Sequence, residues 1–233
     1  MDPVLRGRTW ISTRALLLTA AVLLTGWAVH ATALHRHLAA SRVDPLTGLL
    51  RRDAYTTCAR RLLGRYGDDA IVVMVDADYF KAINDHLGHA AGDTVLTAFG
   101  ARLTAWAGPR AAVGRLGGDE FALVLDLSAD RRVQRLEQLM RMLHTPVVLD
   151  DGSVVDVAAS VGAASPAAVG SRDLSELQRA ADAALYDGKH GGRAVLATAG
   201  HASVPSLNGR RLGRQGTAAF AGPREHGQSP KGD

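Results

Sequence analysis

The chain has 233 residues, of which 47% are hydrophobic and 21% charged, and its formal net charge is +4. This length allows one domain of ordinary size with appendages, and the one cysteine, Cys58, excludes an intrachain disulfide. The composition excludes a chain that is disordered throughout, and the small excess of basic residues gives no reason to expect a nucleic-acid partner.

An apolar run at 15–34 follows a basic N-terminal segment at 1–14. The run reads ALLLTAAVLLTGWAVHATAL, with His30 as its one ionisable residue, and twenty residues in a helix would span about 30 Å, enough to cross a bilayer core. We predict a transmembrane helix at 15–34 and a helical linker at 35–43. A signal peptide cleaved after 31–33 (Ala-Thr-Ala) and a buried soluble helix stay open as alternatives. Arginines flank the run on both sides, so their distribution does not fix its orientation.

Strand and helix patterns alternate through a domain at 44–198. Apolar residues at helical spacing predict helices, and short apolar runs bounded by turn residues predict strands. The predicted helices cover 51–66, 94–106, 133–143 and 174–186, and the predicted strands cover 70–78, 111–116, 121–125, 147–149, 154–161 and 194–196. Because a short hairpin joins two of the strands, we predict an α/β (α+β) fold with a mixed sheet. Residues 199–233 show no periodic apolar face and are predicted to form a disordered basic tail.

Acidic residues end one predicted strand and lie at the tip of one predicted hairpin. Asp76 and Asp78 end a buried strand and, with a period of two, face the same side. Asp119 and Glu120 follow two glycines, which leave room for a ligand. If the two elements are neighbours, their carboxylates would hold a divalent cation suited to chemistry on a phosphate. The plainer alternatives are a solvated strand end and an ordinary hairpin, and no sequence of the form G-x-x-x-x-G-K-[ST] indicates a P-loop.

Four motifs resemble, in order, those of the GGDEF-domain diguanylate cyclases. They read DPLTGLLRRDAY from Asp44, DADYFKAINDHLGHAAGD from Asp76, RLGGDEF from Arg115 and ADAALYDGKHGGR from Ala181. The resemblance implies a mixed sheet wrapped by helices, like that of polymerase palms and class III nucleotide cyclases. It also implies that two GTP molecules, one in each subunit of a homodimer, condense to cyclic di-GMP and two pyrophosphates with Mg²⁺ or Mn²⁺.

The same resemblance implies roles for individual residues. The metal would be held by the carboxylates of Asp76, Asp119 and Glu120 and by the backbone carbonyl of Ala77. Asp119 matches the position commonly assigned as proton acceptor, although the sequence leaves open which carboxylate takes the proton, and Glu120 and Lys81 are the other catalytic candidates. The substrate-binding candidates are Asn84 and Asp93 for guanine, Phe80 and His89 beside them, Gly117 and Gly118 near the triphosphate, and Lys189 and Arg193 for phosphate. A carboxylate suits guanine because it accepts hydrogen bonds from N1–H and the N2 amino group together, and adenine lacks that donor pair.

Some positions depart from the family pattern. Gly108 and Ala111 stand where an Arg-x-x-Asp product-inhibition site would be, so we expect no feedback through it. Gly188 replaces a usual alanine, which we expect to loosen that helix end at little cost.

We therefore expect a single-pass protein of the bacterial cell membrane, with a cytoplasmic catalytic domain that makes a second messenger as a homodimer. A catalytically inactive GTP-binding or scaffolding module is the alternative, and a cyclase of the same fold with another product is a third possibility.

Overall fold

The structure is a computed structural model that describes residues 13–40, 42–189 and 191–203. The chain divides into two units, Met1–Arg42 and Val43–Asp233. The first contains one helix, α1 (Thr13–Ala40), which runs on through 35–40, so the predicted linker is continuous with the apolar run. The transmembrane helix predicted at 15–34 is not confirmed: over the described part of the chain, no helix combines the length and hydropathy needed to cross a bilayer.

Both predicted terminal segments lie largely outside the described residues. These are the basic segment at 1–14, of which only the last two residues are described, and the tail from 204 onward. The first part of the predicted tail, however, contains a one-turn helix, α8 (Ala199–Ala202).

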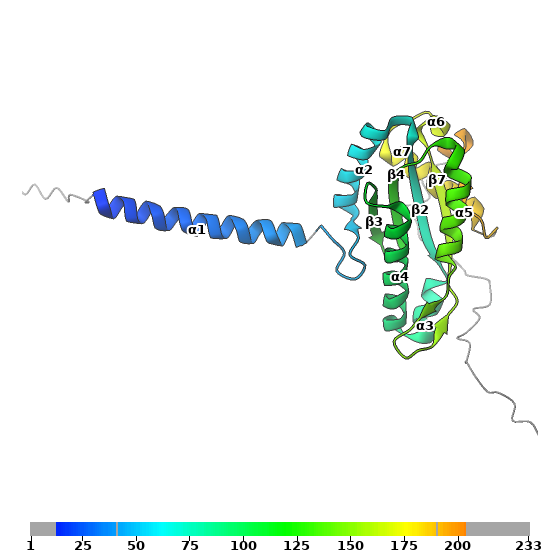
Figure 1. Cartoon of the computed structure of the whole chain (residues 1–233), viewed down its shortest axis with the longest axis horizontal. Coiled ribbons are helices and arrows are strands. Elements are labelled where there is room, and N and C mark those ends of the chain that lie inside the picture. The colour runs from blue at the N-terminus through cyan, green and yellow to red at the C-terminus, as the bar shows by residue number, and fades with distance from the viewer. Residues whose placement is uncertain (1–12, 41, 190, 204–233) are drawn as a thin grey trace, which may run out of the picture. The chain divides into compact units, whose positions relative to one another are not determined.

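A six-stranded mixed sheet lies at the centre of the second unit, with the strand order β1-β3-β4-β2-β7-β8 (Figure 1). Its strands are β1 (Leu50–Arg51), β2 (Ala70–Asp78), β3 (Ala112–Gly117), β4 (Glu120–Asp126), β7 (Ala158–Ala164) and β8 (Val195–Leu196). Strand β2 lies in the middle, antiparallel to β4 and β7, and the edge strands β1 and β8 run parallel to their neighbours. The predicted mixed sheet is confirmed.

One predicted strand is wrong in its extent. The run predicted at 154–161 is two strands in different sheets: β6 (Val154–Val155) pairs with β5 (Val147–Val148), whereas β7 joins the main sheet beside β2. The break falls at the exposed Asp156. A continuous apolar pattern does not reveal a change of pairing partner, because both segments bury side chains.

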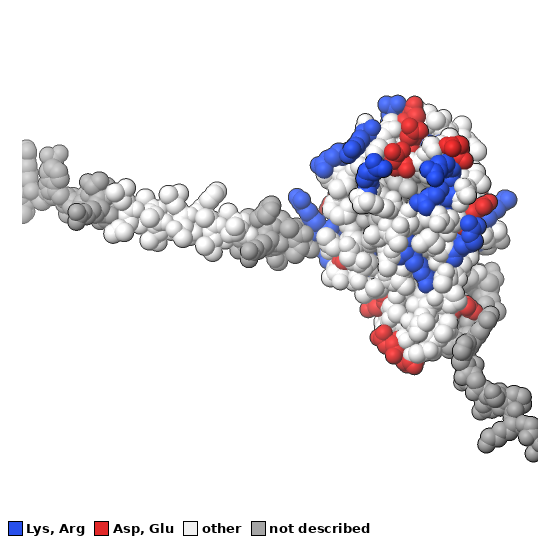
Figure 2. All heavy atoms as spheres, viewed as in Figure 1, with Lys and Arg blue, Asp and Glu red and all other residues white. Residues whose placement is uncertain are grey.

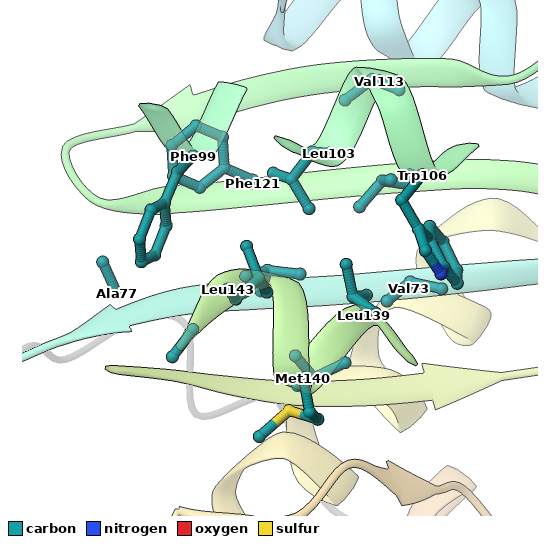
Figure 3. Close-up of a cluster of buried hydrophobic side chains, with 14 of the residues drawn as sticks. Val73, Ala77, Phe99, Leu103, Trp106, Val113, Phe121, Leu139, Met140 and Leu143 are labelled. Carbon is teal, nitrogen blue, oxygen red and sulfur yellow. The ribbon is translucent and has the colours of Figure 1, made fainter. Parts of the chain in front are cut away.

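Helices cover both faces of the main sheet. On one face lie α4 (His89–Ala107) and α5 (Arg132–Leu143), and on the other lie α2 (Arg52–Tyr66) and α7 (Leu174–Gly188). Alternate residues of β2 enter the two cores: Ile71, Val73, Val75 and Ala77 pack with α4 and α5 (Figure 3), and Ala70, Val72 and Met74 pack with α2 and α7. Each face of β2 therefore belongs to a separate hydrophobic core.

Short helices complete the unit. They are α3 (Phe80–Leu87), α6 (Pro166–Val169) and the 3-10 turns η1 (Gly67–Asp69) and η2 (Ala129–Arg131). The helix predicted at 94–106 begins earlier, at His89, directly after α3, and Gly88 at φ +85° separates the two. Eight residues are too few to show a clear helical period, so the apolar pattern missed α3.

The face that carries α4 and α5 has mixed charge (Figure 2). Basic side chains gather over its middle and upper parts, and acidic ones lie at both ends, including the end near α3.

Strand β7 approaches helix α7 very closely at Gly162. A Cβ at this position would overlap the carbonyl oxygen of Ala181 and the backbone nitrogen of Leu185, and would lie 2.8 Å from the Leu185 Cα. These are backbone atoms of a helix, so they cannot turn aside as a flexible side chain can. The glycine therefore sets the distance between the sheet and α7.

We predict that Gly162→Ala lowers the free energy of unfolding by about 1–3 kcal/mol, because α7 must move away from β7 to make room. Chemical denaturation would measure this loss in the free energy of unfolding. Gly64→Ala is the matched control: it lies in α2 with nothing within 4 Å of the added Cβ, and should raise stability by about 0.5–1 kcal/mol. Equal stability of the two variants would contradict the close approach at Gly162.

Candidate active site

The acidic end of β2 and the acidic hairpin lie side by side. Strands β2 and β4 are in register with Asp76 directly opposite Glu120. The backbone N–H of Ala77 also donates to the carbonyl of Asp119 at 3.1 Å. Because Ala77 packs with α4 and α5, alternation places Asp76 on the α7 face of the sheet, with Glu120 beside it. The condition set for the metal site, that the two acidic elements are neighbours, is therefore met.

The hairpin tip is a tight turn that a single arginine holds in place. Gly117 and Glu120 pair across the tip, so Gly118 and Asp119 are the two turn residues. Gly118 has φ +54°, a conformation that favours glycine at the first position of such a turn. The Arg115 Nε donates to the Gly118 carbonyl at 2.9 Å, and its Nη1 donates to Asp44 Oδ2 at 3.0 Å. The tip is thus tied to the segment at the start of the second unit.

Lys189 brings a positive charge to the acidic strand end. Its Nζ lies 2.7 Å from Asp76 Oδ1 and 3.8 Å from Asp78 Oδ1. Ser160, on β7, donates to Asp78 Oδ1 at 2.8 Å. Burial raises the pKa of Asp78 above its usual value and repulsion from Asp76 adds to the rise, whereas the Ser160 hydrogen bond and the charge of Lys189 oppose it. The two strand-end acids therefore share one ammonium group.

The backbone beside Lys189 is held by close packing. Gly188 is buried at the end of α7, and a Cβ there would lie 2.9 Å from the Arg193 carbonyl and 2.8 Å from Val195 Cγ2. The Gly188 carbonyl also accepts from the N–H of Gly191 at 2.8 Å. The expectation that Gly188 loosens this helix end stays a prediction, and the missing side chain lets Arg193 and Val195 pack closely against it.

The donor set at the end of β2 fits a hard divalent cation. The carboxylates of Asp76, Asp119 and Glu120 and the carbonyl of Ala77 are all oxygen donors, which Mg²⁺ prefers. Among the residues that the structure describes, no three His, Cys, Asp or Glu side chains form a metal-binding cluster. Mg²⁺ usually binds through one or two carboxylates together with substrate phosphates and water, so this set fits a cation that arrives with a nucleotide.

The predicted guanine-binding residues lie where α3 meets α4. The Asn84 Oδ1 lies against Gly92, the residue before Asp93, and a Cβ at Gly92 would overlap it. The Phe80 Cε2 would lie 3.2 Å from the same Cβ. The structure thus brings Asn84 and Phe80 to the turn of α4 that carries Asp93, whereas His89 is exposed at the start of that helix. Their contacts with guanine stay predictions.

Two other predicted residues lie on exposed surfaces. Lys81 is exposed on the first turn of α3. Arg193 lines a cavity of about 320 Å³, together with Glu137 and Arg141 of α5. Their phosphate contacts stay predictions, as does the loss of feedback at Gly108 and Ala111, which form a turn after α4.

Sequence reasoning missed two features of the site. It did not predict the ion pair between Lys189 and Asp76, although both lie in the quoted motifs. It missed Ser160 altogether, because that residue belongs to none of the motifs. Its position on a strand that pairs with the acidic end of β2 would have been the signal.

Comparison with known proteins gives consistent matches to one family. The family described as "Diguanylate cyclase, GGDEF domain" matches residues 41–194. An uncharacterized 19.3 kDa protein in the repSA 5' region of Streptomyces ambofaciens is 44% identical over 174 residues, which cover 73% of this chain and 92% of that protein. The diguanylate cyclase DgcN of Escherichia coli is 36% identical over 151 residues, or 63% of this chain and 36% of the cyclase. The chain therefore matches little more than a third of that cyclase's length.

A solved structure shows the same fold. It contains the GGDEF domain of TpbB (YfiN) from Pseudomonas aeruginosa, which is 34% identical and has a TM-score of 0.62. The match covers 68% of this chain and 96% of that domain.

The ion pair between Asp44 and Arg115 makes stability depend on pH. Burial alone would raise the pKa of Asp44, but hydrogen bonds from Thr47 and Arg115 outweigh it, so the pKa lies below its ordinary value. A carboxyl whose pKa is lower in the folded chain adds stability above the unfolded pKa of about 3.9, and this stability is lost as the pH falls through the folded pKa.

We predict that Asp44→Asn lowers the free energy of unfolding by about 1.5–3 kcal/mol at pH 7, because the hydrogen bonds to a charged group are lost. The difference from wild type should shrink as the pH falls below about 4. Urea unfolding at pH 7, 5 and 3 would measure both effects. The control is Asp150→Asn in an exposed loop, which should change stability by less than about 0.5 kcal/mol. A loss that is independent of pH would count against the charge of Asp44 as its cause.

Proposed function

This chain belongs to the GGDEF family of diguanylate cyclases, and we propose that it condenses two GTP molecules into cyclic di-GMP and two pyrophosphates as a homodimer. The observation that carries the proposal is the register between β2 and β4, which sets Asp76 opposite Glu120 and Ala77 beside Asp119. Two strands thus bring together oxygen donors that suit a phosphate-bound cation.

The site residues divide the chemistry among them. The carboxylates of Asp76, Asp119 and Glu120 and the Ala77 carbonyl would hold Mg²⁺, which when bound neutralises charge on the triphosphate and makes the α-phosphate more electrophilic. Asp119, at the hairpin tip, would accept the proton of the attacking 3′-hydroxyl. Asp93 would accept from guanine N1–H and the N2 amino group, with Asn84 beside it, and so select guanine over adenine. Lys189 would contact phosphate oxygens, as we propose in more detail below.

The product requires two such sites facing each other. Each new bond joins the 3′-oxygen of one GTP to the α-phosphorus of the other, and the bond from that phosphorus to the pyrophosphate oxygen breaks. A cyclic product needs this step twice, in opposite directions. A two-fold symmetric homodimer with one GTP in each subunit supplies both steps with the same residues.

We also propose that α1 attaches the chain to the bacterial cell membrane, with the catalytic unit in the cytoplasm, where GTP is made. Its large apolar side chains are 63–74% exposed, and leaving such a continuous apolar surface in water is unfavourable. They are Leu17, Leu18, Val22, Leu23, Leu24, Trp27 and Val29. Contact with membrane lipid would remove these side chains from water.

We predict that purified full-length protein converts GTP to cyclic di-GMP with Mg²⁺, and that Asp119→Asn lowers turnover at least about 100-fold, because the proton acceptor is lost. Chromatography of the products would measure both. The exposed-loop variant Asp150→Asn should keep wild-type turnover. GTP binding without product would favour the inactive-module alternative, a different cyclic nucleotide would favour a different cyclase, and full turnover by Asp119→Asn would remove that residue from the mechanism.

We predict that the full-length chain sediments with membranes and that Leu23→Arg shifts part of it to the soluble fraction, because an arginine interrupts the apolar surface that α1 would present to lipid. Immunoblots of salt-washed fractions would measure the distribution. Val133→Arg changes an exposed apolar residue of α5 and should leave the distribution unchanged. Recovery of the wild-type chain in the soluble fraction would overturn the proposed attachment.

A further inference from the structure

One ammonium group lies between the two acids that end β2. It is hydrogen-bonded to Asp76, the acid that would ligate a metal, and it lies 1.1 Å farther from Asp78, at 3.8 Å against 2.7 Å. We propose, on the basis of the cyclase function above, that the Lys189 ammonium group forms an ion pair with Asp76 until a metal binds that carboxylate, and then moves to form an ion pair with Asp78. Lys189 would then control whether the metal binds alone or together with the nucleotide.

The Lys189–Asp76 pair is largely shielded from water. The Lys189 side chain is 20% exposed and that of Asp76 is 8% exposed. Charges so far out of water interact strongly, and breaking a buried pair without replacing a partner is costly. A metal ion that binds Asp76 through Oδ1 must therefore displace the lysine, and this displacement weakens the binding of the metal.

Asp78 is close enough to serve as an alternative partner for Lys189. The hydrogen bond from Ser160 holds Asp78 Oδ1, the oxygen that lies 3.8 Å from the Lys189 Nζ. A charged hydrogen bond has a length of about 2.8 Å, so a shift of about 1 Å is enough to form one. Asp78 pairs with Ala158 of β7 and lies beyond the end of the register with β4. We therefore assign Asp78 as a positioning residue for Lys189 and not as a metal ligand.

The backbone of Lys189 need not move for this exchange. The N–H of Lys189 donates to the Tyr186 carbonyl at 3.2 Å. The preceding Gly188 is packed against Arg193 and Val195, as described above. Rotation of the side chain alone can therefore move the ammonium group from one acid to the other.

The consequence is a coupling between metal and nucleotide. A metal that binds alone through Asp76 Oδ1 must displace the lysine and gains no phosphate ligands. A metal that binds with a triphosphate gains those ligands, and the displaced ammonium group gains phosphate oxygens as partners near Asp78. Lys189 thus disfavours the metal-only state and favours the state that holds metal and nucleotide together.

The test measures Mn²⁺ binding to the full-length protein without nucleotide, using the electron paramagnetic resonance signal of free Mn²⁺. We expect Lys189→Met to bind Mn²⁺ at least about 5-fold more tightly than wild type, which is the lower end of typical coupling between two ligands. Lys189→Arg keeps the charge and should bind Mn²⁺ as weakly as wild type. Equal affinity of wild type and Lys189→Met would overturn the proposal.

Arg61→Met is the matched control for general electrostatics. It removes one positive charge from α2, which covers the same face of the sheet as α7 and on which Arg61 is exposed, and should change the affinity less than about 2-fold because screened surface charges interact weakly. If this control raised the Mn²⁺ affinity as much as Lys189→Met does, the proposal that the metal directly displaces Lys189 would be overturned.

A double-mutant cycle tests the role of Asp78. Asp78→Asn should weaken Mn²⁺ binding more in the wild-type background than in the Lys189→Met background, because only in the former does a displaced ammonium group lose its second partner. Equal weakening in both backgrounds would remove Asp78 from the exchange.

These measurements need no GTP turnover. A chain that makes cyclic di-GMP but shows no effect of Lys189 on Mn²⁺ affinity would refute the exchange and leave the proposed function standing. A chain that shows the effect but makes no cyclic di-GMP would refute the function and keep the exchange.

Discussion

Two carboxylates in direct register across adjacent strands are the constraint on which this site depends. Asp76 and Glu120 face each other in the sheet, and like charges in opposed positions destabilise strand pairing unless a cation lies between or beside them. One such cation is the Lys189 ammonium group, which lies at the end of α7. The family's chemistry supplies another with the nucleotide. The site can therefore be understood as one negative cluster that two kinds of positive charge can neutralise.

The rest of the unit keeps this cluster in place. Strand β2 is the central strand, and its alternate side chains enter two separate cores, so it cannot rotate or slide without disturbing both. The hairpin that carries Asp119 is held by Arg115, whose other hydrogen bond reaches Asp44. The helix that carries Lys189 is seated against the sheet at Gly162. Each charged group thus sits on an element whose position is set by packing elsewhere.

Much of the fold could be predicted from the sequence because its signals are local. The apolar run that ends in Asp76 and Asp78 indicated a buried strand, and the glycines before Asp119 indicated a hairpin. The strand break at Asp156 and the short helix α3 could not be predicted, since one depends on which strand is the partner and the other is too short to show a period.

The candidate site was predictable in its acidic residues and not in the contacts among them. Motif resemblance named Asp76 and Lys189 in separate segments, but their ion pair depends on how α7 packs over the sheet. Ser160 carried no signal of its own, because a serine in a strand is ordinary until its partner strand is known.

Because the side chains of β2 alternate between the two faces of the sheet, the face that Asp76 and Asp78 occupy depends on the length of the strand more than on its composition. Exchanging one apolar residue for another within 70–75 leaves the acids where they are, but adding or removing a single residue there would reverse which face every later side chain occupies. Asp76 and Asp78 would then point into the core beneath α4 and α5, away from Lys189. Homologues that keep this chemistry should therefore vary in residue type along the strand while keeping an unchanged spacing between its start and its acidic end.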